Sequence, residues 1–124
     1  MAFTPTATLQ IAQIPTTGGG SLGISLVRYT LAGDAATEDL ATQLVGIANG
    51  LPAGAEILAW INGAIAATDY ANDAGTALAL PTFAHAAQTL RYLMTDDGAV
   101  AAAVGDVSAS AAGAGDAIVI WAQQ

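Results

Sequence analysis

The fold class is decided by residues 21–31, which read SLGISLVRYTL. Apolar side chains alternate on the two faces of this stretch, with Leu22, Ile24 and Leu26 on one face and Val27, Tyr29 and Leu31 on the other. A period of two predicts a β-strand. Apolar residues on both faces predict that the strand is covered on two sides, by a second sheet or by a neighbouring subunit.

The residues before this strand predict an extended segment. They are rich in threonine and proline, alternate over residues 7–14 and stop at the glycine run 18–20. We expect residues 1–20 to form either an arm or an edge strand, and residues 21–124 to form a single β-rich domain.

The arm hypothesis depends on Phe3, Leu9, Ile11 and Ile14, for which little nearby sequence offers burial. Ordering an extended segment costs about 1–2 kcal/mol per residue in backbone entropy, so an arm becomes fixed only where a partner surface offsets that cost. The expected partner is an adjacent subunit or a capsid shell, and the alternative is an ordinary first strand of the same domain. If the arm hypothesis holds, deleting residues 1–15 weakens assembly and leaves the remaining domain folded.

A helical period occurs over Ala35 to Asn49. Thr37 suits the N-cap, Glu38 and Asp39 suit the first turn of a helix, and Gly50 suits its end. The apolar residues at helical spacing are Leu40, Leu44 and Ile47. This pattern predicts a short helix in an otherwise β-rich chain.

The next segment predicts a turn and a strand. The sequence LPAGA at residues 51–55 is typical of a turn, and residues 56–67 return to a period of two. Asn62 and Gly63 leave two alternatives open there, a hairpin turn or one bulged strand. The expected faces are Ile57, Ile61 and Ile65 on one side, and Leu58, Trp60 and Ala64 on the other.

The remaining residues predict further short strands. Residues 81–94 fit either a helix begun by Pro81 or a strand over residues 89–94, and the pattern favours a short helix or turn followed by that strand. Residues 99–104, 106–112 and 117–122 are three apolar runs separated by glycine-containing turns. These runs predict a β-meander at the C-terminal end.

Charge and composition exclude several classes of partner. The chain has 124 residues, no lysine, two arginines and a net charge of −8, so we expect no binding to nucleic acid or to anionic lipid. It has no cysteine, which excludes disulfides and thiolate metal sites.

The mean hydropathy of +0.55 raises the question of a membrane span. The longest uncharged stretch, residues 1–27, contains Pro5, Pro15 and the glycine run, so it predicts no spanning helix. It also lacks the basic start and the continuous apolar core of a secretory signal. We therefore expect no membrane partner and synthesis in a cytoplasm.

The possible catalytic and cofactor motifs are weak. Residues 18–23 match G-x-G-x-x-G, but an alternating strand follows where a dinucleotide site needs a helix, so the glycines predict a hairpin turn. His85 is the only histidine and has no carboxylate at helical spacing. None of Ser21, Ser25, Ser108 and Ser110 lies in a nucleophile-elbow sequence.

The acidic residues also predict ordinary structure. Asp96 and Asp97 precede Gly98 as in a turn, and the spacing of Asp69, Asn72 and Asp73 does not follow a calcium loop. The sequence thus predicts no catalytic residues, no cofactor and no metal, and therefore a protein that is not an enzyme.

Aromatic residues in the predicted strands suit either the core or a subunit contact, where tryptophan and tyrosine are enriched. Taken with the apolar residues of the first segment, they form the candidate interface, which consists of Phe3, Leu9, Ile11, Ile14, Tyr29, Trp60 and Trp121. An apolar chain of this size with few catalytic side chains is expected to form a homo-oligomer that buries surface between copies.

Four features resemble one known family: the threonine-rich start, the strand over residues 21–31, the LPAGA turn leading into EILAWI at residues 56–61, and the C-terminal run AIVIW at residues 117–121. Together they are similar to small virion proteins of tailed bacteriophages, particularly capsid decoration or cement proteins. The resemblance covers about residues 20–122 and implies a mainly β, antiparallel β-sandwich or jelly-roll-like fold, here with one or two short helices.

The resemblance also implies a function. A decoration protein oligomerises, often as a trimer, and binds the major capsid protein on the outside of the head, which it stabilises. The expected location is then the virion. The alternatives are a phage fibre or tail component, and a small oligomeric enzyme or ligand-binding domain.

Overall fold

The computed structural model describes residues 3–32, 37–65, 71–72, 75–76, 78–95 and 112–124. Its elements are β1 (Phe3–Pro15), β2 (Ser21–Ala32), β3 (Thr37–Asp39), α1 (Leu40–Gln43), β4 (Glu56–Ile65), β5 (Ala71–Asn72), β6 (Gly75–Thr76), β7 (Leu78–Ala84), β8 (Thr89–Thr95) and β9 (Ala112–Gln123). The prediction of a mainly β protein with antiparallel sheets and a short helix is confirmed. The finer prediction of a sandwich or jelly roll stays a prediction.

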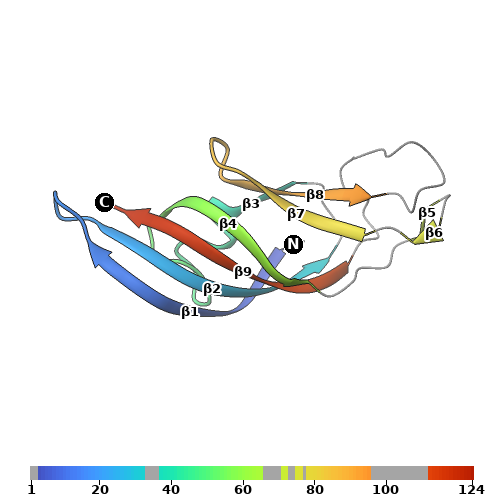
Figure 1. The fold of residues 1–124 in the computed structure, drawn as a ribbon, viewed down its shortest axis with the longest axis horizontal. Helices are drawn as coiled ribbons and strands as arrows, with labels where there is room; N and C mark the ends of the chain where they lie inside the picture. Colours follow the sequence, from blue (N-terminus) through green and yellow to red (C-terminus); the bar gives the residue numbers. More distant parts are fainter. Residues whose placement is uncertain (1–2, 33–36, 66–70, 73–74, 77, 96–111) are drawn as a thin grey trace.

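The largest element is a four-stranded antiparallel sheet with the order β1-β2-β9-β4. Its long strands lie side by side and curve along the molecule (Figure 1). A three-stranded sheet has the order β3-β8-β7, and β5 pairs with β6. In the large sheet β9 is central although it comes last in the chain, so the sheet forms only when the C-terminal strand inserts between β2 and β4.

The expected arm is a strand of the chain's own sheet. β1 pairs with β2 of the same chain from Phe3↔Leu31 to Pro15↔Ser21, so these residues form an edge strand of the chain's own sheet. Their contact with an adjacent subunit or a capsid shell stays a prediction. Thr16 N–H donates to Gly20 O at 2.9 Å, and Gly18 and Gly19 have positive φ angles of 106° and 90°. The glycine run is therefore the predicted hairpin turn.

The predicted helix over residues 35–49 is largely wrong. Only Leu40–Gln43 is α-helical, and its N-cap is Asp39, whose carboxylate accepts from Ala41 N–H at 3.0 Å, instead of Thr37. Pairing with β8 holds Thr37–Asp39 in a strand. Beyond the helix, Leu51 N–H donates to Leu44 O at 2.8 Å. The pairing with β8 before the helix and the Leu51–Leu44 backbone bond after it thus leave room for a single helical turn.

β4 is one bulged strand, which settles the alternatives at Asn62 and Gly63. One of its two irregularities lies between Ile57 and Ala59 and changes the side to which later residues point. Ile57 and Trp60 consequently both contact the core cluster, whereas Ile61 is 49% exposed. The expected shared face of Ile57 and Ile61 is therefore wrong.

Residues 81–94 form strands. β7 and β8 make an antiparallel hairpin whose turn is His85–Gln88, so the predicted strand over residues 89–94 is confirmed and the helix alternative is wrong. Pro81 lies in β7, which is at the edge of its sheet, where the missing N–H of proline is tolerated.

The predicted C-terminal meander is only partly described. β9 runs without a break from Ala112 to Gln123, so the turn expected at residues 113–116 is wrong. Gly115 pairs with Tyr29 and Gly113 with Leu31, because β2 is long enough to offer partners there. The expected run 99–104, and the run 106–112 except Ala112, lie outside the described residues.

The core lies on one face of the large sheet. Phe3 stacks on Tyr29 at 5.0 Å between ring centroids, and Trp60 approaches Tyr29 at 5.8 Å. Trp121 is fully buried and donates its indole N–H to Ser25 Oγ at 2.9 Å. The cluster also includes residues from α1, from the loop after it and from β8, namely Leu40, Leu44, Leu51, Ala55 and Leu90. These elements cover the core face.

Candidate interaction surfaces

The opposite face of the large sheet is apolar. The strand register aligns three rows of residues on it: Leu9, Leu26, Ile118 and Ile61; Ala12, Ile24, Ile120 and Ala59; and Ile14, Leu22, Ala122 and Glu56. We call these twelve residues the outer face. Glu56 is its only polar member, and it lies at one corner.

The outer face is uncovered by the residues that the structure describes. Leu9 is 64% exposed, Ile14 54% and Ile61 49%. Four strands spaced about 4.8 Å apart, each contributing about five residues at about 3.4 Å per residue, cover a projected area of about 300 Å². The largest apolar patch of a monomer is about 300–600 Å² and often functional, so the outer face is a candidate contact site.

The nearest charges at the other end of the outer face neutralise each other. Arg28 and Asp116 are opposite each other in the register, and Arg28 Nε donates to Asp116 Oδ1 at 2.9 Å. The hydrogen bond from Arg28 lowers the pKa of the Asp116 carboxyl, and the same bond raises the pKa of Arg28. The outer face is thus neutral over most of its area although the chain carries a net charge of −8.

The candidate interface residues divide into two groups. Leu9, Ile11 and Ile14 are exposed on β1, where a partner can reach them. Phe3, Tyr29 and Trp121 are fully buried in the chain's own core, so their prediction as interface residues is wrong. Trp60 is half-buried and packs against Phe3 and Tyr29. Aromatic residues of a strand pattern do not by themselves show which of two faces becomes the core.

Sequence reasoning missed the part that β4 contributes to this surface. Ile61 lies on the outer face, and Leu58, at the bulge, is 41% exposed. A bulge leaves no clear mark on the apolar pattern, so the sequence of β4 does not show that Ile61 points to the outer face. The apolar even-numbered residues of β2 were the signal that the sequence did provide, and they lie in the middle of the outer face.

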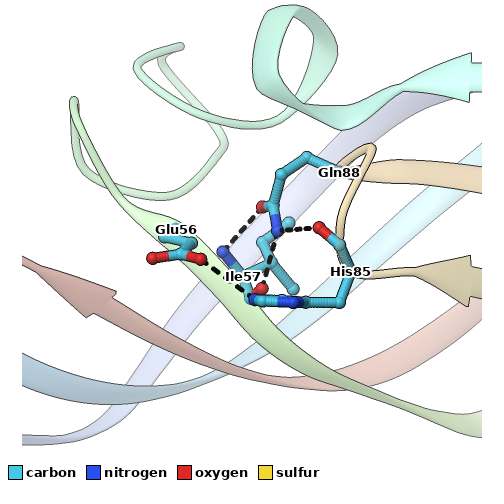
Figure 2. A network of polar contacts seen from close by, with 4 residues as sticks. All are labelled: Glu56, Ile57, His85 and Gln88. Atoms are coloured by element: carbon cyan, nitrogen blue, oxygen red, sulfur yellow. Dashed lines mark hydrogen bonds and ion pairs between the residues drawn. The ribbon is translucent and has the colours of Figure 1, made fainter.

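The two edges of the large sheet differ. At the β4 edge, Gln88 Oε1 accepts from Ile57 N–H at 2.8 Å, and Gln88 Nε2 donates to Ile57 O at 2.9 Å. Figure 2 shows this amide beside the strand, where it takes the place of a neighbouring strand. Gln88 Nε2 also donates to His85 O at 2.8 Å, and Gln88 has a positive φ of 53°. The turn of the β7–β8 hairpin therefore closes this edge at Ile57.

His85 lies in the same turn. Its Nε2 is 2.9 Å from Glu56 Oε1, and both side chains are more than half exposed. An exposed pair of this kind contributes little to stability, and its members come from distant parts of the chain, so no local spacing could reveal it. The arrangement offers no nucleophile beside the histidine among the residues of this network.

The remaining motif residues do not gather at a site. Ser21 begins β2, Ser25 accepts the hydrogen bond from Trp121, and Asn72 lies in β5. The other residues of these motifs lie outside the described part of the chain, and they are Asp69, Asp73, Asp96, Asp97, Ser108 and Ser110. Within the described ranges, no three acidic or histidine side chains come together as metal ligands.

A groove opens beside β1 on the core side of the sheet. Its volume is about 560 Å³, and it is lined by Thr8, Gln10, Ser25 and residues 46–53. Thr8 Oγ1 donates to Asn49 O across it. No charged side chain is among these lining residues, so the groove offers no acid or base.

Comparison with known proteins yields no match among family models, curated proteins or solved structures. In the described residues, no helix has the length and apolar character that crossing a bilayer requires.

Proposed function

We propose that this protein is a non-catalytic structural protein of a tailed-phage virion, and that it binds the outside of the capsid through its outer face. The observation that carries the proposal is the neutral, apolar sheet face opposite the core, which the described residues leave uncovered. The resemblance of the LPAGA turn and the following strand to decoration proteins supports the major capsid protein as the partner.

Burial of the outer face supplies the binding energy in this proposal. Full burial of a leucine or isoleucine side chain stabilises by about 1.5–3 kcal/mol, so residues that are half exposed, such as Ile14 and Ile61, contribute about 1 kcal/mol each. A patch of this size gives weak attachment for one copy. A homo-oligomer, whether the trimer that the resemblance implies or a dimer, presents several outer faces to a shell at once and binds more tightly through avidity.

The first experiment is mass spectrometry of purified heads, tails and soluble protein from a lysate of the phage that carries the gene. The proposal predicts recovery of the chain with heads in a fixed ratio to the major capsid protein. Recovery with tails or fibres, or only in the soluble fraction, contradicts the capsid assignment.

The second experiment tests the surface. Heads that lack the protein are incubated with the purified wild-type chain, with Ile61→Asp, or with Ile47→Asp, and bound protein is measured by sedimentation. Ile61→Asp places a charge on the outer face and is expected to abolish most binding. Ile47 is also a partly exposed isoleucine, at 38%, but lies in the loop after α1, so Ile47→Asp is the matched control and keeps wild-type binding. Equal binding of both variants would show that the outer face is not the contact.

A further inference from the structure

The open edge of the large sheet is β1. The β4 edge is closed at Ile57 by the Gln88 amide, whereas β1 has strand β2 on one side only. No described residue pairs with its other side, and only Thr8 and Ala12 are shielded to an intermediate degree between residues 6 and 15. An edge strand leaves alternate N–H and C=O groups free to pair with another strand.

β1 carries two prolines and two bulges but lacks the charged side chains that commonly protect such an edge. Native edge strands commonly carry charged side chains that repel other strands, but residues 3–15 contain no charged residue. Instead the strand exposes Leu9, Ile11 and Ile14, the three most exposed large apolar side chains described. Pro5 and Pro15 remove N–H donors near its ends, so the available segment is residues 6–14.

We propose that β1 pairs antiparallel with β1 of a second copy of this chain, about a twofold axis perpendicular to the sheet. An antiparallel pair of identical strands is self-complementary, as a twofold interface requires. The neutral strand is also the place where two chains of charge −8 approach with the least repulsion.

The side chains of β1 fit this partner. Gln10 Nε2 donates to Gln13 Oε1 at 2.8 Å on the exposed strand, and an amide both donates and accepts, so these two residues can bond to their copies across the axis. Ile11 is the extra residue of the bulge between Gln10 and Ala12, and its 56% exposed side chain is covered when a second strand adds.

The pairing would also enlarge the contact surface. A perpendicular twofold axis puts both outer faces on the same side of one eight-stranded sheet, so the projected apolar area rises from about 300 to about 600 Å². That is closer to the area of about 800 Å² per partner that stable protein interfaces bury. The inference about the edge does not depend on the identity of the capsid partner, since it concerns only two copies of the chain.

The test begins with the mass in solution, measured by light scattering over the micromolar range. The expected result is a dimer with twice the 12.2 kDa mass of the chain. The variant Ile11→Glu puts like charges beside each other at the paired edge and is expected to raise the dimer dissociation constant about tenfold or more. Ile61→Glu, on the outer face at the opposite edge, is the matched control and leaves the dimer intact.

Cysteine substitution locates the contact, because the natural chain has no cysteine. Single cysteines are placed in turn at the exposed positions 6, 7, 9, 10, 11, 13 and 14, and at Ala86 in the β7–β8 turn as a control, and each variant is oxidised. Directly opposite residues of an antiparallel pair have Cβ atoms about 4.5–5.5 Å apart, so the position nearest the axis cross-links fastest.

The outcomes separate this inference from the proposed function. A monomer, a mass of three chains, or equal cross-linking at Ala86 and along β1 overturns the edge pairing. If Ile61→Asp loses capsid binding while the dimer persists, both proposals stand. If the dimer forms but heads never bind the chain, only the capsid assignment fails.

Discussion

Gly23 of β2 lies directly against the indole of Trp121 on β9. A Cβ added at Gly23 would lie 2.1 Å from both Cε2 and Cζ2 of Trp121, which is far inside van der Waals contact. Trp121 is fully buried and cannot swing into solvent without opening the core. We therefore expect Gly23→Ala to displace the indole and to break its hydrogen bond to Ser25.

The magnitude follows from three effects. Overpacking a core costs about 1–3 kcal/mol, and loss of a buried hydrogen bond costs about 1 kcal/mol. Replacing glycine by alanine inside a strand recovers about 0.5–1 kcal/mol through backbone entropy. The expected net loss is about 2 kcal/mol in the free energy of unfolding, a large part of the 5–15 kcal/mol that is typical of a domain.

Urea unfolding followed by far-UV circular dichroism measures this loss, and a double-mutant cycle assigns it to the indole. In a Trp121→Leu background no side-chain atom occupies the position of the clash, so Gly23→Ala should there be neutral or stabilising by up to about 1 kcal/mol. A stabilising osmolyte keeps this background folded during the measurement. Equal losses in the two backgrounds would refute the packing argument.

Three further predictions concern the core and the closed edge. Tyr29 is buried, its hydroxyl has no hydrogen-bond partner among the described residues, and burial followed by the Asp116 charge raises its pKa to about 12. The unfolded side chain ionises near its ordinary pKa of about 10, so the free energy of unfolding falls between about pH 10 and 12. Tyr29→Phe should keep the stability at neutral pH and remove this part of the fall. Urea titrations at several pH values measure both effects. Gln88→Ala loses three hydrogen bonds and is expected to cost about 2 kcal/mol of unfolding free energy in the same assay. The control Thr82→Ala, at an exposed position of the same hairpin, should stay within about 0.5 kcal/mol of the wild type. Equal effects of the two substitutions would contradict the edge closure. Phe3→Ala removes a fully buried ring and should cost about 3–5 kcal/mol of unfolding free energy. Deletion of residues 1–15 removes the whole strand and should unfold the domain. A truncated chain that is folded by circular dichroism would contradict the assignment of β1 to this sheet.

Several elements could be predicted because their signals are local. The alternation over residues 21–31 is sufficient for β2, since successive residues of a strand point to opposite faces. The glycine run at residues 18–20 predicts its turn because glycine adopts positive φ without steric cost. Of the three apolar residues at helical spacing, Leu40 and Leu44 are buried although the helix around them is a single turn, and Ile47 is 38% exposed.

The errors arise where a distant segment decides the conformation. Residues 35–49 have a helical period, but Thr37–Asp39 pair with β8, which lies about fifty residues later in the chain. Residues 113–116 look like a turn, yet they are paired along β2. Backbone hydrogen bonds to a long-range partner outweigh a preference of a few tenths of a kcal/mol per residue.

The sequence by itself determined the strand β2, the turn at residues 18–20 and the neutral first segment, because each of these depends on residue type and short-range spacing. Only the tertiary structure decided which apolar residues form the core and which form the outer face. That choice depends on where β9 inserts between β2 and β4 and on the bulge between Ile57 and Ala59, and a shift of one residue in register exchanges the two faces of a strand.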